Sequence, residues 1–214
     1  TPFGDLTVNN WLVWDKTSRE AVAFDTGADC TRLLNHLRNN QLRLKAILLT
    51  HADGDHIWGN PLLQNAEIIM TAACDEEGRE MKAAAMAMLG KAGQALERFG
   101  RGNIKKIGNY FHNMVAPYDF RGIVVTGSTR TCAGETTLEV GGREVRLIEV
   151  GPAHTRGDLL VYVPDAKTIF CGDIIFSGGT PVLWAGPVEN WLAALEMILD
   201  MDVETVIAGH GPVD

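Results

Sequence analysis

A dense group of histidine and aspartate residues directly after an apolar run is the feature that most restricts how this chain can fold. Residues 45–49 (KAILL) form a short, nearly continuous apolar run, as is typical of a β-strand covered on both faces. The next stretch, residues 50–60 (THADGDHIWGN), places two histidines and two aspartates within six residues. Few soluble chains place that much charge and imidazole at a strand end for stability alone, so this pattern predicts a functional site there.

Other imidazole and carboxylate side chains follow expected strand ends or lie in tight loops farther along the chain. The complete set is His51, Asp53, Asp55, His56, His154, Asp173 and His210. If residues 51–55 continue roughly extended, the alternate side chains of His51, Asp53 and Asp55 point to one side. Imidazole and carboxylate groups are the usual ligands of zinc, iron and manganese, so the set predicts a metal site.

The order of expected strands and helices favours a layered α/β domain. Strands are expected at residues 10–14, 21–24, 45–49, 67–70, 136–140, 143–150, 159–163, 168–171 and 205–208, and helices after residue 30 and at 188–199. Residues 10–24 form one expected hairpin, and Gly141-Gly142 predicts another between residues 136 and 150. We expect a single domain over residues 1–214, with residues 75–130 as a mainly helical insertion or cap.

Composition narrows the classes of partner. The formal net charge is −8 and no basic run is visible, which disfavours a nucleic-acid partner. The chain has no apolar stretch of membrane-spanning length and no secretory signal at its start, so we expect a cytoplasmic protein without a membrane partner, a removed leader being the open alternative. The four cysteines lack a C-x-x-C pair and are expected as buried free thiols. The oligomeric state is left open.

Five sequence blocks in order resemble a known family. The stretch THADGDH is similar to the T-H-x-H-x-D-H signature of the metallo-β-lactamase superfamily, and FDTG (24–27), GPAHTRGD (151–158), FCGD (170–173) and GHGP (209–212) follow the family's order. The resemblance implies a four-layer αβ/βα sandwich whose site lies at one edge, between two β-sheets. It is much less specific for substrate, because one fold supports many activities.

The resemblance also implies roles for individual residues. His51 and His154 would bind a first metal ion, Asp173 would bridge both ions, and Asp25 would shape the site loops. A second ion would be bound by Asp55, His56 and His210. The implied cofactors are therefore two divalent metal ions, with zinc preferred and iron or manganese as alternatives.

Asp53 departs from the family pattern, because it stands where the family usually has a second histidine. An aspartate can still bind a metal ion through a hard anionic oxygen, which would give a first site of two histidines and one carboxylate. That set also resembles the site of non-haem iron oxygenases, and flavodiiron proteins of the same superfamily carry a glutamate here. The alternative is that Asp53 lies outside the ligand set and the first site is weak or empty.

The leading functional prediction is an enzyme, a metal-dependent hydrolase of a small-molecule ester, lactone, thioester or amide. A metal-activated hydroxide would attack the substrate, and Asp55 would receive or pass its proton. The alternative is an iron-dependent redox enzyme of the same fold, either an oxygenase or flavodiiron-like. A metal-stabilised binding protein is a third class, but its metal sites would be closed. Trp58, Trp184 and His112 are candidate substrate contacts, with packing or a surface position as the alternative for each.

Overall fold

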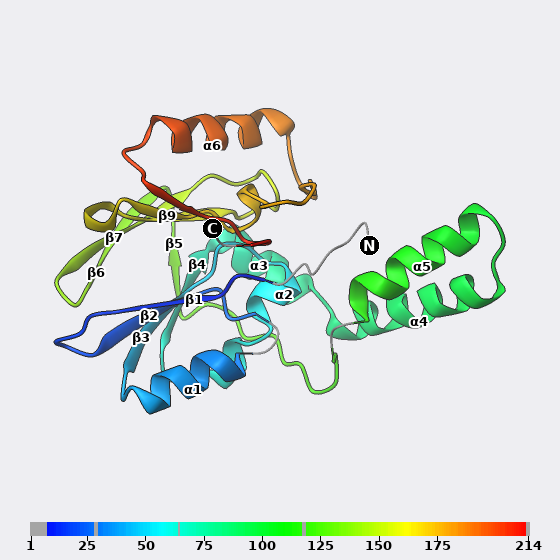
Figure 1. Cartoon of the computed structure of the whole chain (residues 1–214), viewed down its shortest axis with the longest axis horizontal. Coiled ribbons are helices and arrows are strands. Elements are labelled where there is room, and N and C mark those ends of the chain that lie inside the picture. The colour runs from blue at the N-terminus through cyan, green and yellow to red at the C-terminus, as the bar shows by residue number, and fades with distance from the viewer. Residues whose placement is uncertain (1–7, 28–29, 64, 117–118, 213–214) are drawn as a thin grey trace. The chain divides into compact units, whose positions relative to one another are not determined.

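Two β-sheets in the described residues carry most of the fold in the computed structural model, which describes residues 8–27, 30–63, 65–116 and 119–212 (Figure 1). The first sheet has the order β1 (Trp11–Trp14), β2 (Glu20–Phe24), β3 (Arg43–Leu48), β4 (Glu67–Thr71) and β5 (Arg130–Cys132). The second has the order β10 (Thr205–Ile207), β9 (Thr168–Phe170), β8 (Leu159–Val163), β7 (Arg143–Glu149) and β6 (Glu135–Val140). Both sheets mix parallel and antiparallel pairs.

The inner faces of the two sheets share one apolar core. Phe24 of β2 stacks on Phe170 of β9, with ring centroids 3.9 Å apart and planes 9° from parallel. Leu48 of β3 and Leu147 of β7 are fully buried in the same cluster. Alternating apolar side chains that are removed from water on both inner faces stabilise this sheet-on-sheet contact, at about 25 cal/mol per Å² of apolar surface.

Helices cover the outer faces of the sheets (Figure 1). α1 (Thr31–Asn39) buries Leu33 and Leu37, four residues apart on one stripe. α6 (Val188–Asp200) packs Trp191 and Ile198 against the outer face of the second sheet. The layers therefore run helix, sheet, sheet, helix, and the prediction of a four-layer αβ/βα sandwich is confirmed.

Both expected hairpins are present. β1 pairs antiparallel with β2, and β6 pairs antiparallel with β7. Gly141 and Gly142 link the second pair with φ values of 59° and 79°, a left-handed conformation that glycine adopts without steric cost. β5 was not expected as a strand, because it contains only three residues and two of them are exposed.

One expectation of local structure was wrong. Residues 51–55 do not continue extended, because α2 (Gly54–Ile57) begins directly after Asp53. At the start of the expected helical insertion, α3 (Ala72–Glu80) is followed by α4 (Ala83–Phe99), and Met81 and Lys82 lie outside both helices. Three single 3-10 turns complete the described elements: η1 (Asn60–Leu62), η2 (Pro164–Ala166) and η3 (Gly172–Ile174).

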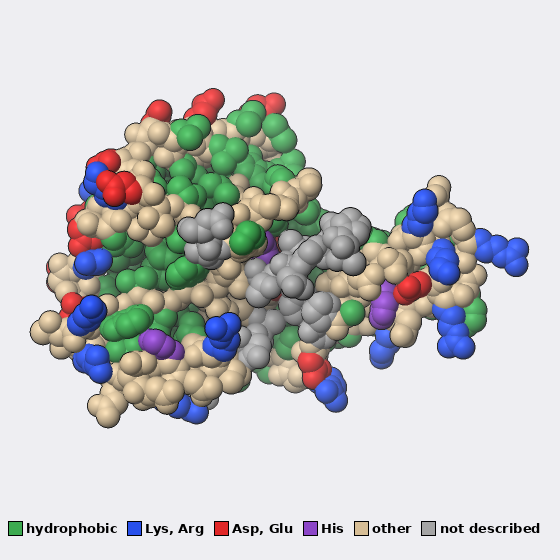
Figure 2. All heavy atoms as spheres, viewed as in Figure 1, with side chains coloured by type: hydrophobic (Ala, Val, Ile, Leu, Met, Phe, Trp, Pro, Cys, Tyr) green, Lys and Arg blue, Asp and Glu red, His purple; other side chains and the backbone are tan. Residues whose placement is uncertain are grey.

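The chain divides into two compact units, one of residues 1–79 with 125–214 and one of residues 80–124. The second unit contains α4 and α5 (Asn103–Val115), and Lys and Arg side chains are spread over its surface (Figure 2). These helices approach closely through glycine, since a Cβ at Gly93 would lie 2.6 Å from the backbone nitrogen of His112. That this helical unit is a cap stays a prediction.

Two further sequence expectations concern the cysteines and the membrane. All four cysteines are buried and none is in a disulfide, as expected. Among the described residues, no helix is both long enough and apolar enough to cross a membrane.

Candidate metal centre

All seven predicted ligand residues lie within the first unit, in two groups. The first group contains His51, Asp53, His154 and Asp173, and the second contains Asp55, His56 and His210. Within each group, one ligand-type atom per residue lies within 4.8 Å of the corresponding atoms of the others. Side chains separated by up to 159 positions in sequence therefore converge at one place.

Strand ends bring the two groups together. β3 leads into His51, and α2 turns the chain so that Asp55 and His56 leave the path of Asp53. β9 leads through Cys171 into η3, which carries Asp173, and β10 leads into His210. His154 lies in the loop between β7 and β8. Because β2, β3 and β4 run parallel, as do β9 and β10, their carboxyl ends open to the site.

Asp173 lies between the groups. Its Oδ1 is 3.3 Å from Nε2 of His56, and its Oδ2 is 3.3 Å from Nε2 of His210 and 3.4 Å from Nε2 of His154. Gly209 makes room for this carboxylate, since a Cβ there would lie 2.1 Å from Oδ1 of Asp173. One carboxylate thus faces histidines of both groups.

A buried hydrogen-bond network orients two of the histidines. Asp25 accepts bonds from the backbone nitrogen and the hydroxyl of Thr50, each at 2.8 Å, and lies 2.9 Å from Nδ1 of His56. The Thr50 hydroxyl, which donates to Asp25, is 3.0 Å from Nδ1 of His51 and can accept its proton. Both imidazoles are then protonated at Nδ1 and present Nε2 to the site, as metal-binding histidines do.

A surface loop orients the third histidine. The carbonyl oxygen of Val182 lies 2.7 Å from Nδ1 of His154, which therefore donates its proton there and turns Nε2 inward. Nε2 of His154 lies 3.3 Å from Oδ2 of Asp53, and the same oxygen accepts a bond from the indole Nε1 of Trp184 at 3.1 Å. A residue 131 positions away thus contacts the unusual aspartate.

The protonation of the group follows from burial and neighbouring charge. Burial lowers the pKa of His51 to about 3, so its imidazole is neutral near pH 7. Burial also opposes protonation of His154, but the hydrogen bond to Asp53 and the charge of Asp173 outweigh it and raise the pKa to about 9. Burial raises the pKa of Asp55. For Asp173 burial acts in the same direction, but the adjacent His56 and His51 hold its pKa well below the usual range.

The geometry suits bound cations. Nε2 of His51 and Oδ1 of Asp173 are buried without a hydrogen-bond partner among the described residues. Nε2 of His56 and Nε2 of His210 lie 3.2 Å apart, so two lone pairs face each other unless a proton or a cation lies between them. Buried polar groups normally have partners, and a divalent ion in each group would supply them.

The three predicted substrate contacts fall in different places. Trp58 is buried, and its ring fills the space that a Cβ at Gly54 would occupy, 2.0 Å from a ring carbon. Trp184 is 60% exposed and reaches Asp53. His112 lies on α5 in the helical unit. Substrate contact by each of them stays a prediction.

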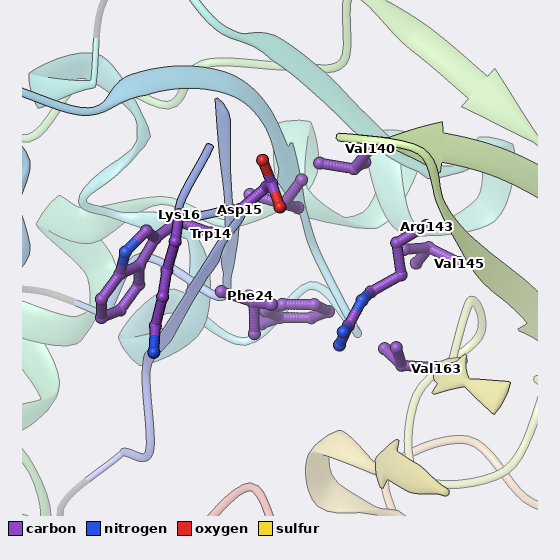
Figure 3. A pocket seen from close by; sticks show the side chains of 10 residues that line it. Trp14, Asp15, Lys16, Phe24, Val140, Arg143, Val145 and Val163 are labelled. Carbon is purple, nitrogen blue, oxygen red and sulfur yellow. The ribbon is translucent and has the colours of Figure 1, made fainter. Parts of the chain in front are cut away.

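Sequence reasoning missed one orienting group and a separate cavity. The carbonyl of Val182 orients His154 but carries no side-chain signal. A cavity of about 250 Å³ opens between the two hairpins, lined by residues such as Val13, Phe24, Arg143 and Val163 (Figure 3). None of the seven clustered residues lines it, so it is distinct from the candidate centre.

Comparison with known proteins adds three findings. The family model of the metallo-beta-lactamase superfamily matches residues 3–210. A hydroxyacylglutathione hydrolase of Synechococcus sp. (strain JA-3-3Ab) is 34% identical over 85 residues, covering 40% of this chain and 33% of the relative. Another, of Shewanella baltica (strain OS223), is 26% identical over 195 residues, covering 91% of this chain and 57% of the relative.

A solved structure shows the same fold. The BLEG-1 B3 metallo-beta-lactamase superposes with a TM-score of 0.68 at 24% identity, covering all of this chain and 91% of that one. The curated relatives are longer: this chain spans about one third of the first and little more than half of the second.

Proposed function

Since the chain belongs to the metallo-beta-lactamase superfamily, we propose that it is a metal-dependent hydrolase that cleaves an acyl bond in a small-molecule substrate, with thioesters as the first class to test. One observation carries this proposal: seven imidazole and carboxylate side chains from distant parts of the chain converge in two adjacent groups around Asp173. Five of these side chains are buried, which is expensive unless hydrogen bonds or a bound cation satisfy their polar atoms.

The proposed cofactors are two divalent cations. His51, Asp53 and His154 would bind the first, and Asp55, His56 and His210 the second, with Asp173 shared between them. Zinc suits the histidines in both groups, whereas the hard carboxylate of Asp53 makes iron or manganese the alternatives for the first group. When bound, the cations lower the pKa of coordinated water and polarise the oxygen that gains charge.

The chain's own residues prepare this chemistry. The Asp25 network and the carbonyl of Val182 hold protons on the Nδ1 atoms of His51, His56 and His154, which directs each Nε2 atom into the site. Pre-oriented groups of this kind spare the reaction the cost of reorganisation.

Asp55 is the proposed group for proton transfer. Its carboxylate lies 3.5 Å from Nε2 of His210, and the side chain is 23% exposed, so it faces both the centre and the solvent. Burial raises its pKa, which makes it a better proton acceptor than a solvated aspartate. A proton taken at an Asp55 carboxylate oxygen would then pass to the departing thiolate, which leaves as the thiol.

The name shared by the sequence relatives supports a thioester substrate. A hydroxyacylglutathione is a thioester, and its hydrolysis breaks the carbon–sulfur bond and gives an acid and a thiol. The relatives' name therefore favours hydrolysis over the redox alternative. An acidic chain with net charge −8 gives no support for a nucleic-acid partner.

A loading experiment tests the proposal. Chelator-treated protein, reloaded with zinc, manganese or ferrous iron, is assayed on a hydroxyacylglutathione, a simple acetyl thioester, a lactone and a β-lactam. We expect thioester hydrolysis that disappears on chelation and returns with cation, and that falls roughly 10²–10⁴-fold in Asp55→Asn. Asp119→Asn, at an exposed ion pair with Arg121, is the matched control. Metal-independent turnover, or none on any acyl substrate, contradicts the proposal.

A further inference from the structure

A short loop contacts the two residues that distinguish the first ligand group. We call residues 182–186 the 182–186 loop. In this loop the carbonyl of Val182 accepts a hydrogen bond from Nδ1 of His154, and the indole nitrogen of Trp184 donates one to Oδ2 of Asp53. These bonds measure 2.7 Å and 3.1 Å. One tripeptide thus contacts two ligand side chains that lie 101 positions apart in sequence.

Backbone hydrogen bonds tie this loop to the residues it orients. The backbone nitrogens of Trp184 and Ala185 donate to the carbonyl oxygen of His154 at 2.8 Å and 3.1 Å, and that of Gly186 donates to Ala153 at 2.8 Å. The loop and His154 are therefore held together, although residues 182–185 are exposed. The indole of Trp184 starts from a fixed backbone position.

The hydrogen-bonding chemistry of the indole restricts which side chain at position 53 can both contact Trp184 and bind a cation. An indole nitrogen donates a hydrogen bond and cannot accept one. A carboxylate has two oxygens, so it can accept the indole proton and still present lone pairs to a cation. A histidine that binds a cation through one nitrogen carries a proton on the other, and two donors would face each other.

We propose that Trp184 is a positioning residue: its indole N–H fixes the orientation of the Asp53 carboxylate toward a cation in the first group, and this bond makes aspartate the matching residue at position 53. The inference deepens the proposed function, on which it rests for the presence of the cation. Groups that hold a metal ligand in place commonly contribute 10-fold to 100-fold in metal affinity.

The bond itself is tested first, in protein without metal. The chain contains five tryptophans, so the nitrogen–proton spectrum of the labelled protein should contain five indole signals. Trp184→Phe identifies one of them by its loss. In Asp53→Ala that signal should move upfield and exchange faster with solvent, as expected for an indole that has lost its acceptor. An unchanged signal overturns the proposal.

Cation affinity is tested second, by competition with a coloured chelator. Trp184→Phe should weaken binding of one of the two cations about tenfold and leave the other unchanged. In the Asp53→Ala background, Trp184→Phe should have no further effect. Trp14→Phe, at a tryptophan that contacts His36 on α1, is the matched control. Equal affinities in Trp184→Phe and the parent protein overturn the proposal.

These outcomes are separate from the fate of the proposed function. If the protein hydrolyses no acyl substrate, the indole signal and the chelator competition still report on Trp184. If hydrolysis is found but both measurements are unchanged, the proposed function survives and the positioning role is wrong.

Discussion

The two regions that orient the candidate ligands differ in how they are built. The Asp25 network (Asp25, Thr50, His51 and His56) is almost fully buried, and its side chains bond to one another across the carboxyl ends of β2 and β3. The 182–186 loop is mostly exposed and holds its ligands through one carbonyl and one indole. Buried side chains thus orient His51 and His56, whereas an exposed loop orients His154 and Asp53.

This difference has a consequence for tuning. A change in the Asp25 network leaves buried donors without an acceptor, which costs stability as well as function. A change in the 182–186 loop exposes groups that water can satisfy, so the protein should stay folded while the first ligand group changes its properties. Asp53, the residue that departs from the family pattern, is contacted by the loop, which is the region where we expect substitutions to leave the protein folded.

The largest expected effect is that of Asp25→Ala, which breaks the buried region. The backbone nitrogen and hydroxyl of Thr50 and Nδ1 of His56 lose their acceptor together. We expect the free energy of unfolding to fall by about 3 kcal/mol or more, since each unsatisfied buried group costs roughly 1–3 kcal/mol. Urea denaturation measures this change. Asp119→Ala at the exposed ion pair should change it by less than about 0.5 kcal/mol, and an equal loss in both variants would show that the loss is not specific to the buried network.

A smaller effect is expected from Asp53→His, which sharpens the comparison on the loop side. In the parent background the new imidazole N–H faces the indole donor, so the first cation should bind no better. In the Trp184→Phe background that conflict is absent, and zinc affinity should be about tenfold higher than in Asp53→His alone. Because Trp184→Phe is expected to lower affinity about tenfold in the parent background, the coupling between the two positions should be about 2.8 kcal/mol. Chelator competition on the four proteins of this cycle gives the value. Strictly additive effects would show that the two residues act independently.

The smallest expected effect is a pH dependence of the metal-free protein. The folded chain raises the pKa of His154 to about 9 from a usual 6.5, so its proton is bound more tightly in the folded than in the unfolded state. That stabilisation is complete below pH 6.5 and is lost as the pH rises through about 9. The free energy of unfolding should therefore fall between pH 6.5 and 9.5, by on the order of 1–2 kcal/mol.

Two histidine variants isolate this contribution. His154→Gln should lower the slope of the profile between pH 6.5 and 9.5, because one group with a raised pKa is gone. His56 remains, and although burial opposes its protonation, the charges of Asp173 and Asp25 raise its pKa well above the usual value. His36 on α1 is exposed and lies against Trp14 of β1. The variant His36→Gln should keep the parent's slope of unfolding free energy against pH. Equal slopes in the His154→Gln variant and the parent protein would show that other groups produce the pH dependence.

Sequence patterns predicted the parts of the fold that depend on local chemistry. The Gly141-Gly142 pair predicted the β6–β7 hairpin, because few other dipeptides adopt its left-handed backbone. β5 escaped prediction because three residues carry no recognisable period. Extension through Asp55 was also wrong, since the chain turns into α2 with Gly54 packed against the ring of Trp58.

The candidate site likewise contains residues that the sequence predicted and contacts that it did not. The seven imidazole and carboxylate residues could be named in advance because their residue types and strand-end positions are visible in sequence. The bond between Trp184 and Asp53 could not, since it joins residues 131 positions apart whose proximity depends on how the loop folds back over His154. Val182 contributes only a backbone carbonyl, which every residue has.

The contacts around His210 have a consequence for the order in which the molecule is made. Val8 forms a bridge with His210, and the side chain of Asn9 donates to the carbonyl of Gly211, 202 positions away. The first ligand group, by contrast, is complete in sequence once Asp173 has been synthesised. At roughly 5–20 residues per second, several seconds of translation separate Asp173 from His210. A growing chain therefore acquires all the ligands of its first group while the second still lacks a histidine, and Asn9 meets its partner Gly211 only after 202 further positions have been added.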